Sequence, residues 1–401
     1  MKPRYRVGCA KADITPPLGI PYLGHVPRHA PIRAVHDPLF ARATCIEAGT
    51  DRVIVISADT IGFADTLLGQ DRSFVGEVKR EIELATGTPG SHVMLASNHI
   101  HSSPETLGFR PLSASYPEAH SWLEGLQATL VSCATAACRD SVKANLRIGR
   151  GAAPGLSYNR RSENCVDEEI VLLRFDSARG PEVLLVNYGC HPVVVQAQEL
   201  ASADYVGAMV AAVEARLSGL RSCQFLLGAC GDLDPSVRVT RRFSNAEDMG
   251  QRLAEEVLRT AKGAEADSSP PTVRGASQVV TFPSRPLPPA EETQDEEALV
   301  RLAEGSGPFR GEVQVLRVGG AVLVGLPGEV FCGTGLALKR LAQPLTGLPV
   351  TCANGYLGYM APPEAWEAGG YEVELGPWSK VGPEAPSLLL AAVRALLPEV
   401  G

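Results

Sequence analysis

Short apolar stretches alternate along the chain with longer segments whose apolar residues follow helical spacing. Residues 53–57 (VIVIS) and 92–96 (HVMLA) are short and mostly apolar, which predicts two buried strands. Between them, residues 71–86 carry apolar side chains three and four positions apart, and Gly87 is typical of a helix C-terminus. A strand, a helix and a second strand in this order predict a right-handed β-α-β unit with parallel strands.

The same alternation continues to the C-terminus and predicts an α/β (α+β) fold, with a large mixed β-sheet core flanked by helices. Further strands are predicted at residues 146–148, 170–175, 183–188, 223–227, 312–318 and 321–326, and further helices at residues 118–138, 204–217, 244–262, 291–304 and 387–397. Asp204 is a typical N-cap for one of these helices. Residues 263–289 include two proline-rich stretches and mark a possible internal boundary. Because site-like polar residues lie on both sides of it, we expect residues 1–401 to form a single domain.

Several predicted strands end in a polar residue that stands close to a glycine or a proline. The carboxyl ends of parallel strands lie at one edge of a sheet, and ligand sites gather there in open α/β sheets. The pattern therefore predicts one site at the strand ends. The residues concerned are Asp59, His99, His101, His191, Asp232, Asp234 and Glu329.

The histidines and Glu329 give this site a metal-binding character. His99 and His101 are one residue apart, so in extended backbone they point to the same side, although two hydrogen-bonded loop histidines are the alternative. His191 follows an apolar strand and is a plausible third ligand; a buried histidine bonded to backbone is the alternative. Glu329 is either a ligand or a glutamate favoured by a helix N-terminus. Histidines with one carboxylate are the pattern of zinc hydrolases.

Composition and charge limit the classes of partner and the cellular locations that we expect for this protein. The net charge of −8 disfavours a nucleic-acid partner, and no run approaches the ~18 apolar residues of a membrane span, so we expect no stable membrane insertion. Residues 1–6 lead into no apolar segment of a secretory signal. Ten cysteines without a Cys-x-x-Cys motif predict reduced thiols in a cytoplasmic protein.

Other catalytic motifs are absent from the sequence. There is no Gly-x-Ser-x-Gly elbow, no His-Glu-x-x-His helix and no Gly-x-x-x-x-Gly-Lys phosphate loop. Cys190 stands beside His191, but neighbouring residues on a strand point to opposite faces, which disfavours a cysteine nucleophile. A metal-assisted reaction is therefore the favoured chemistry.

A series of short segments runs in one order across almost the whole chain. They are residues 8–17 (GCAKADITPP), 39–43 (LFARA), 98–104 (NHIHSSP), 159–160 (NR), 191–192 (HP), 202–207 (SADYVG), 231–235 (GDLDP), 327–329 (PGE), 354–359 (NGYLGY) and 371–372 (YE). In this order they resemble the N-terminal catalytic domain of the neutral/alkaline non-lysosomal ceramidases. The family usually has Ser-Gly-Pro where this chain has Ser102-Ser103-Pro104. The chain ends soon after the last segment, so the family's C-terminal immunoglobulin-like domain is not expected.

The resemblance implies a zinc-dependent amidohydrolase that cleaves a linear N-acyl amide by attack of zinc-bound hydroxide. The zinc ligands it implies are His99, His191, Glu329 and Tyr359. The residues it places around the scissile carbonyl are His101, Arg160 and Tyr371, with Arg161 as the alternative to Arg160. From the sequence alone, Tyr356, Tyr359 and Tyr371 are only aromatic residues near a glycine-rich loop. The expected substrate is a small-molecule or lipid-like N-acyl compound, and ceramide is not required.

Two other functions fit the same residues. One is a zinc-dependent esterase or acyl transferase that acts on a small metabolite. The other is a non-catalytic, metal-containing binding protein. A TIM-barrel amidohydrolase with a His-x-His motif needs more histidines and carboxylates after successive strands than this chain supplies. The sequence predicts no oligomeric state.

Overall fold

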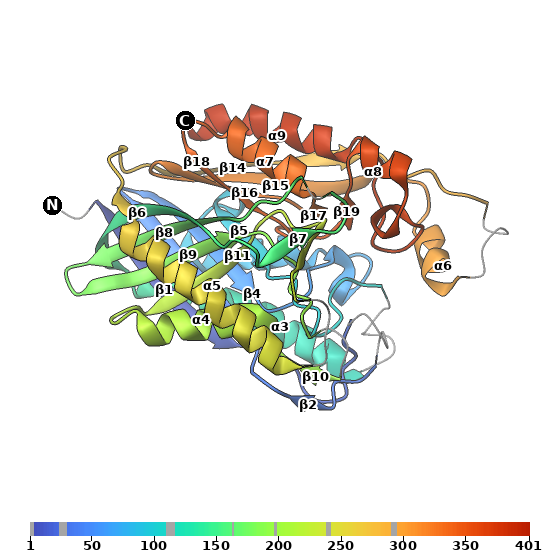
Figure 1. Cartoon of the computed structure of the whole chain (residues 1–401), viewed down its shortest axis with the longest axis horizontal. Helices are drawn as coiled ribbons and strands as arrows, with labels where there is room; N and C mark the ends of the chain where they lie inside the picture. Colours follow the sequence, from blue (N-terminus) through green and yellow to red (C-terminus); the bar gives the residue numbers. More distant parts are fainter. Residues whose placement is uncertain are drawn as a thin grey trace.

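Two β-sheets lie face to face at the centre of the molecule, and helices cover the outer face of each sheet (Figure 1). The structure is a computed structural model that describes residues 4–23, 30–109, 117–162, 164–195, 199–237, 242–289 and 295–401. The order of layers is helices, large sheet, small sheet, helices. This arrangement confirms the predicted α/β class and adds a second sheet that the sequence pattern did not separate from the first.

The larger sheet is mixed, as predicted. Its strands, in sheet order, are β11 (Ser222–Leu227), β9 (Gly180–Tyr188), β8 (Glu169–Ser177), β6 (Val142–Ala152), β1 (Tyr5–Asp13), β3 (Phe40–Ala48), β4 (Asp51–Ala58) and β5 (Val93–Ser97), with β13 (Glu265–Ala266) paired to β6. The pairs β4–β5 and β9–β11 are parallel, whereas the other pairs are antiparallel. The parallel β4–β5 pair confirms the predicted β-α-β unit.

The smaller sheet packs its inner face on the larger one. Its strands, in order, are β14 (Val273–Phe282), β15 (Phe309–Val318), β16 (Ala321–Gly325) and β18 (Thr346–Val350). Val55 and Met94 of the larger sheet share one buried apolar cluster with Leu316 and Leu323 of the smaller sheet. The chain crosses from one sheet to the other between β13 and β14, inside the region predicted as a possible boundary.

Helices bury their apolar faces on the outer sides of the two sheets. The larger sheet is covered by α1 (Phe74–Thr86), α3 (Pro117–Arg139), α4 (Asp204–Arg216) and α5 (Phe243–Gly263), and the smaller sheet by α7 (Cys332–Leu341) and α9 (Ala385–Val400). Gly87 ends α1 with φ 72°, as the sequence predicted, whereas the helix begins at Phe74, after the N-cap Ser73, and not at residue 71. No helix in the described part of the chain has the length and apolar content needed to cross a membrane.

The remaining elements are short. They are the strands β2 (Ala34–Val35), β7 (Ser157–Asn159), β10 (Leu200–Ala201), β12 (Leu233–Pro235), β17 (Glu329–Val330) and β19 (Tyr359–Met360), the helices α6 (Glu296–Ala303) and α8 (Pro363–Ala368), and the 3₁₀ turns η1 (Asp65–Leu68), η2 (Gly90–His92) and η4 (Tyr371–Val373). The start predicted for α6, residues 291–294, lies outside the described residues.

Asp204 is buried at the start of α4, but it does not cap this helix as predicted. Ala203 occupies the N-cap position, and Asp204 has left-handed backbone with φ 53°. Its carboxylate accepts hydrogen bonds from the backbone N–H groups of Val195 (3.0 Å) and Tyr205 (2.6 Å). Burial raises the pKa of Asp204 from 3.8 to about 6 despite these bonds.

This shift predicts a pH dependence of stability. Between about pH 4 and 6 the folded state holds a proton on Asp204 that the unfolded chain has released, so this contribution to stability is complete below pH 4 and is lost as pH rises through 6. This difference between the pKa of Asp204 in the unfolded and the folded protein corresponds to about 3 kcal/mol in the free energy of unfolding. We expect Asp204→Asn to remove this slope from urea-unfolding curves recorded from pH 4 to 7. An unchanged slope would contradict the assignment.

Candidate metal centre

His99 stands at the end of β5 in a backbone conformation that side chains rarely adopt. Its φ is 58°, in the left-handed region, and its N–H donates to the Ser97 hydroxyl at 3.0 Å. Its ring Nδ1 lies 2.6 Å from the carbonyl oxygen of Ile61. A non-glycine residue in this region is found most often at turns or functional sites, where the surrounding structure holds it in place. The strained backbone therefore fixes the direction of the His99 ring.

The ring of His191, which follows β9, is also oriented by a hydrogen bond from Nδ1 to a backbone carbonyl oxygen. Its Nδ1 lies 2.6 Å from the carbonyl oxygen of Cys230, so that nitrogen carries a hydrogen, and Nε2 is directed at Glu329. The Nε2 atoms of His191 and His99 lie 2.9 and 3.4 Å from Oε2 of Glu329. Glu329 Oε2 thus meets two ring nitrogens whose Nδ1 partners are held by backbone carbonyls. A protonated imidazole satisfies this arrangement, and so does a metal cation bound by all three atoms when both rings are neutral.

Glu329 in β17 is fully enclosed by these partners. Its second oxygen, Oε1, accepts a hydrogen bond from the Tyr356 hydroxyl at 2.5 Å. Burial by itself raises the pKa of Glu329, but the imidazoles of His99 and His191 hold it well below its usual value. Glu329 is therefore a carboxylate in the folded protein, which is the form that binds a metal ion.

Tyr359 lies beside Glu329 because β17 and β19 pair in parallel with these two residues in register. The Tyr359 hydroxyl oxygen accepts a hydrogen bond from Nη2 of Arg160 at 3.2 Å. Burial and the charge of Glu329 raise the pKa of Tyr359 well above its usual value, while Arg160 acts in the opposite direction. Tyr359 is thus a neutral phenol here, and only a nearby metal cation would make it a phenolate ligand.

These residues fit a zinc ion. Two imidazole nitrogens and one carboxylate oxygen are the donors that zinc prefers, and each histidine is oriented through its other ring nitrogen by a backbone carbonyl. His101 is also close, since its Nε2 lies 3.3 Å from Nε2 of His99. The ligand atoms of His99, His101 and His191 all lie within 4.8 Å of one another. The geometry alone therefore also permits a site with three histidines.

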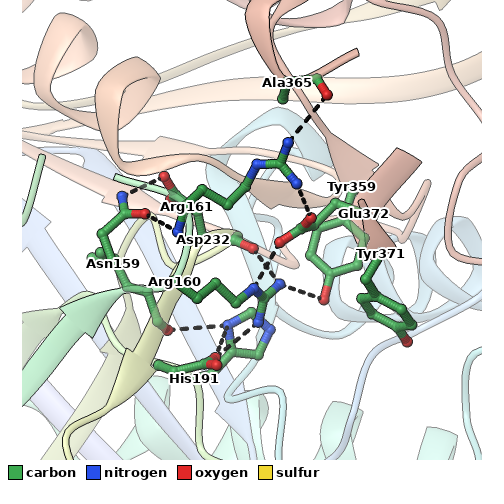
Figure 2. A network of polar contacts seen from close by, with 12 residues as sticks. Asn159, Arg160, Arg161, His191, Asp232, Tyr359, Ala365, Tyr371 and Glu372 are labelled. Atoms are coloured by element: carbon green, nitrogen blue, oxygen red, sulfur yellow. Dashed lines mark hydrogen bonds and ion pairs between the residues drawn. The ribbon is translucent and has the colours of Figure 1, made fainter. Parts of the chain in front are cut away.

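The buried carboxylate of Glu372 binds both Arg160 and Arg161 (Figure 2). Nε of Arg160 donates to Oε1 of Glu372 at 2.7 Å, and Nη1 of Arg161 donates to Oε2 at 2.5 Å. Arg160 also donates to Asp234 at 2.8 Å, whereas Arg161 turns away to the carbonyl oxygen of Ala365. The structure therefore places Arg160, and not Arg161, against Tyr359. Burial opposes its charge, but the carboxylates of Asp234 and Glu372 raise the pKa of Arg160.

Tyr371 in η4 forms part of the wall of the site. Its ring meets Tyr359 edge-on at 6.0 Å between centroids and stacks on Trp378 at 4.8 Å. With these residues it lines a cavity of about 30 Å³ that also contains the edges of His99, His101 and Glu329. A cavity of this size has room for a small ion or one or two water molecules.

A larger groove adjoins this cavity. It has a volume of about 970 Å³ and shares Leu107, Phe109 and Tyr356 with the cavity lining. Its walls are both apolar and charged, as Phe309 and Arg310 illustrate. The groove is large enough for the acyl or amine part of a small amide.

Sequence reasoning gave no role to two residues of the site, although both lie in segments that carry the resemblance, 354–359 and 371–372. Tyr356 donates a hydrogen bond to Glu329, and Glu372 pairs with both arginines. Asp232, predicted at a strand end, accepts hydrogen bonds from Asn159 (2.6 Å) and from the backbone of Cys332 (2.6 Å). Asp232 thereby holds Asn159, the residue before Arg160, in place.

No family model matches the chain. Among solved structures, the crystal structure of neutral ceramidase from Pseudomonas aeruginosa is similar over 100% of this chain and 75% of that chain, with a TM-score of 0.78 and 20% sequence identity. The chain has a neutral ceramidase fold. A second ceramidase structure, complexed with C2, is similar over 100% of this chain and 76% of that chain, with a TM-score of 0.78 and 19% sequence identity. The resemblance stated from the sequence is thereby confirmed at the level of the ceramidase fold.

Proposed function

We propose that this protein is a zinc-dependent hydrolase that cleaves the amide bond of a linear N-acyl compound. The observation that supports it most is the convergence of His99 Nε2, His191 Nε2 and Glu329 Oε2, with Tyr359 paired in register to Glu329. The ceramidase fold supports the amide as the bond cleaved. The ten cysteines are free in the structure, which supports a reducing, cytoplasmic location.

Each residue of the site has a separate task in this proposal. His99, His191, Glu329 and Tyr359 would hold the zinc ion. Zinc, when bound, supplies a Lewis acid and lowers the pKa of water towards neutrality.

The remaining polar groups act on the amide itself. Arg160 is a permanent cation beside the metal centre, and with the Tyr371 hydroxyl it stabilises negative charge on the carbonyl oxygen. His101 transfers a proton to the leaving nitrogen. Glu372 and Asp234 are positioning residues, because they fix the Arg160 guanidinium.

The cavity and the groove suggest the kind of substrate. The cavity at the metal centre holds little more than the reacting groups, so the rest of the substrate must extend into the adjoining groove. Because that groove mixes apolar and charged walls, we propose an N-acyl compound with both apolar and polar parts, and ceramide is not required.

Metal removal is the direct test. We expect exhaustive chelation to lower the hydrolysis of N-acyl substrates to below about 1% and stoichiometric zinc to restore it, because the ion supplies most of the activation. Metal content is followed by elemental analysis, and a dialysed sample without chelator is the control. Full activity in metal-free protein would contradict the proposal. Preference for O-acyl over N-acyl compounds in the same assay would favour an esterase.

His101→Ala separates a catalytic histidine from a metal ligand. We expect this variant to keep its zinc and to lose about 10²- to 10⁴-fold in kcat, as for loss of a general acid. His120→Ala, at a half-buried position on α3 outside the site, is the control. Loss of zinc from His101→Ala would show instead that His101 is a ligand, as the three-histidine geometry permits.

A further inference from the structure

A second cavity lies on the outer face of the larger sheet, and Asp59 in its lining accepts a hydrogen bond from Asn98, the residue before His99. This cavity has a volume of about 270 Å³ and is enclosed by α4, α5 and the strands β1 and β3. It shares no lining residue with the cavity at the metal centre. The chemistry proposed above therefore makes no use of it.

A buried arginine with an unsatisfied donor forms the floor of this second cavity. Arg42 is 5% exposed, and its Nε has no hydrogen-bond partner among the described residues. The nearest carboxylates are Glu214, 3.9 Å from Nε, and Asp59, 3.6 Å from Nη1. Both distances exceed a hydrogen bond. Since a buried N–H without an acceptor is unfavourable, the Nε group calls for an oxygen acceptor from a ligand.

The charges around the cavity are predominantly negative. Two permanent cations, Lys11 and Arg42, face five carboxylates, which are Asp37, Asp59, Asp204, Glu214 and Glu247. Backbone and hydroxyl donors satisfy several of these carboxylates without neutralising their charge, as the bonds from Ala203 N–H and the Ser202 hydroxyl to Asp37 show. This excess of negative charge repels an anion and attracts a cation.

Aromatic and small apolar side chains complete the walls. The rings of His36 and Phe243 stack in parallel with centroids 3.6 Å apart, and the Phe40 ring carries Lys11 Nζ 3.8 Å from its centroid. The opposite wall on α4 is formed by small residues, including Ala208 and Ala211. These apolar walls favour an organic ammonium group over a strongly hydrated inorganic cation.

We propose that this cavity is a binding site for a small organic ammonium compound that also carries a hydroxyl oxygen, namely an amino alcohol. The ammonium group pairs with Glu214 and Glu247, and the oxygen accepts the hydrogen bond from Arg42 Nε. The volume suits a ligand well below drug size. Neither a simple carboxylate nor a simple alcohol meets both requirements.

Paired variants on the two helices test the location of this site. Ala211→Leu fills the cavity from an exposed position on α4, and Ala215→Leu adds the same side chain to the same helix outside the lining. Glu247→Gln removes a charge at the cavity, and Asp248→Asn removes one from the next residue of α5, which does not line it. All four positions are exposed, so folding is preserved.

Calorimetric titration of the zinc-loaded full chain with ethanolamine gives the readout. We expect saturable binding that weakens at least about tenfold in Ala211→Leu and about three- to tenfold in Glu247→Gln, which correspond to one lost contact each. Ala215→Leu and Asp248→Asn should stay within about twofold of the unchanged protein. Absence of saturable binding, or equal binding by Ala211→Leu, would overturn the proposal.

Ligand analogues test the chemical class. Propylamine lacks the hydroxyl group and should bind more weakly than ethanolamine, whereas acetate should not bind at this cavity. Equal affinity for propylamine would overturn the role given to Arg42 Nε. Acetate binding that is lost in Ala211→Leu would overturn the assignment to a cation.

Discussion

Glu329→Ala is expected to release the metal ion and to lower amide hydrolysis by at least about 10³-fold. The Glu329 carboxylate is the only group within reach of both His99 Nε2 and His191 Nε2 that carries a full negative charge among the described residues. Without it, two neutral imidazoles remain, and the Tyr356 hydroxyl loses its acceptor. The metal content per chain and the steady-state rate measure the two effects separately.

A second glutamate-to-alanine variant is the control for effects that do not depend on the metal centre. Glu367→Ala removes an exposed carboxylate on α8 and should change neither metal content nor rate. Circular dichroism establishes that both variants are folded. A folded Glu329→Ala variant that keeps its zinc and its activity would exclude this glutamate as a ligand.

Glu372→Gln is expected to destabilise the fold by about 2–4 kcal/mol, because it leaves two guanidinium groups close together without their shared carboxylate. Glu372 is 3% exposed, and the side chains of Arg160 and Arg161 are 21% and 17% exposed, so solvent screens the pair only in part. Since Arg160 also loses its positioning partner, kcat should fall at least about tenfold. Urea unfolding measures the first effect.

Glu256→Gln on α5 is the matched control for Glu372→Gln. Its partner Arg259 is 71% exposed, and such a pair contributes at most about 1 kcal/mol. The two substitutions make the same chemical change in a buried and in an exposed ion pair. Equal stability of the two variants would show that the buried arginine pair does not depend on Glu372.

The position of the site at the strand ends was predictable because parallel strands place their C-termini at one edge. Asp59 follows β4 and Asn98 precedes His99, and the structure joins Asp59 and Asn98 by a 2.8 Å hydrogen bond. The pairing of Glu329 with Tyr359 was not predictable from pattern, because β17 and β19 have two residues each. Nor does a sequence show which of two adjacent arginines turns towards Tyr359.

Strand β1 illustrates why part of the sheet escaped prediction. It lies in the middle of the larger sheet, yet it contains Gly8 and several charged residues, which are unfavourable for a strand by propensity. A Cβ atom at Gly8 would lie 2.0 Å from the carbonyl oxygen of Ala137, so helix α3 packs directly on the strand backbone. Tertiary packing therefore decides this position against its local preference.

The proposed zinc ligands come from both β-sheets. His99 and His191 follow strands of the larger sheet, while Glu329 and Tyr359 follow strands of the smaller one. A bound ion would thus be a cross-link between two layers, joining residues roughly 230 positions apart in the chain. Its binding energy would count towards the docking of the two layers as well as towards chemistry. Zinc-free protein should therefore unfold at a lower denaturant concentration than the zinc-loaded protein.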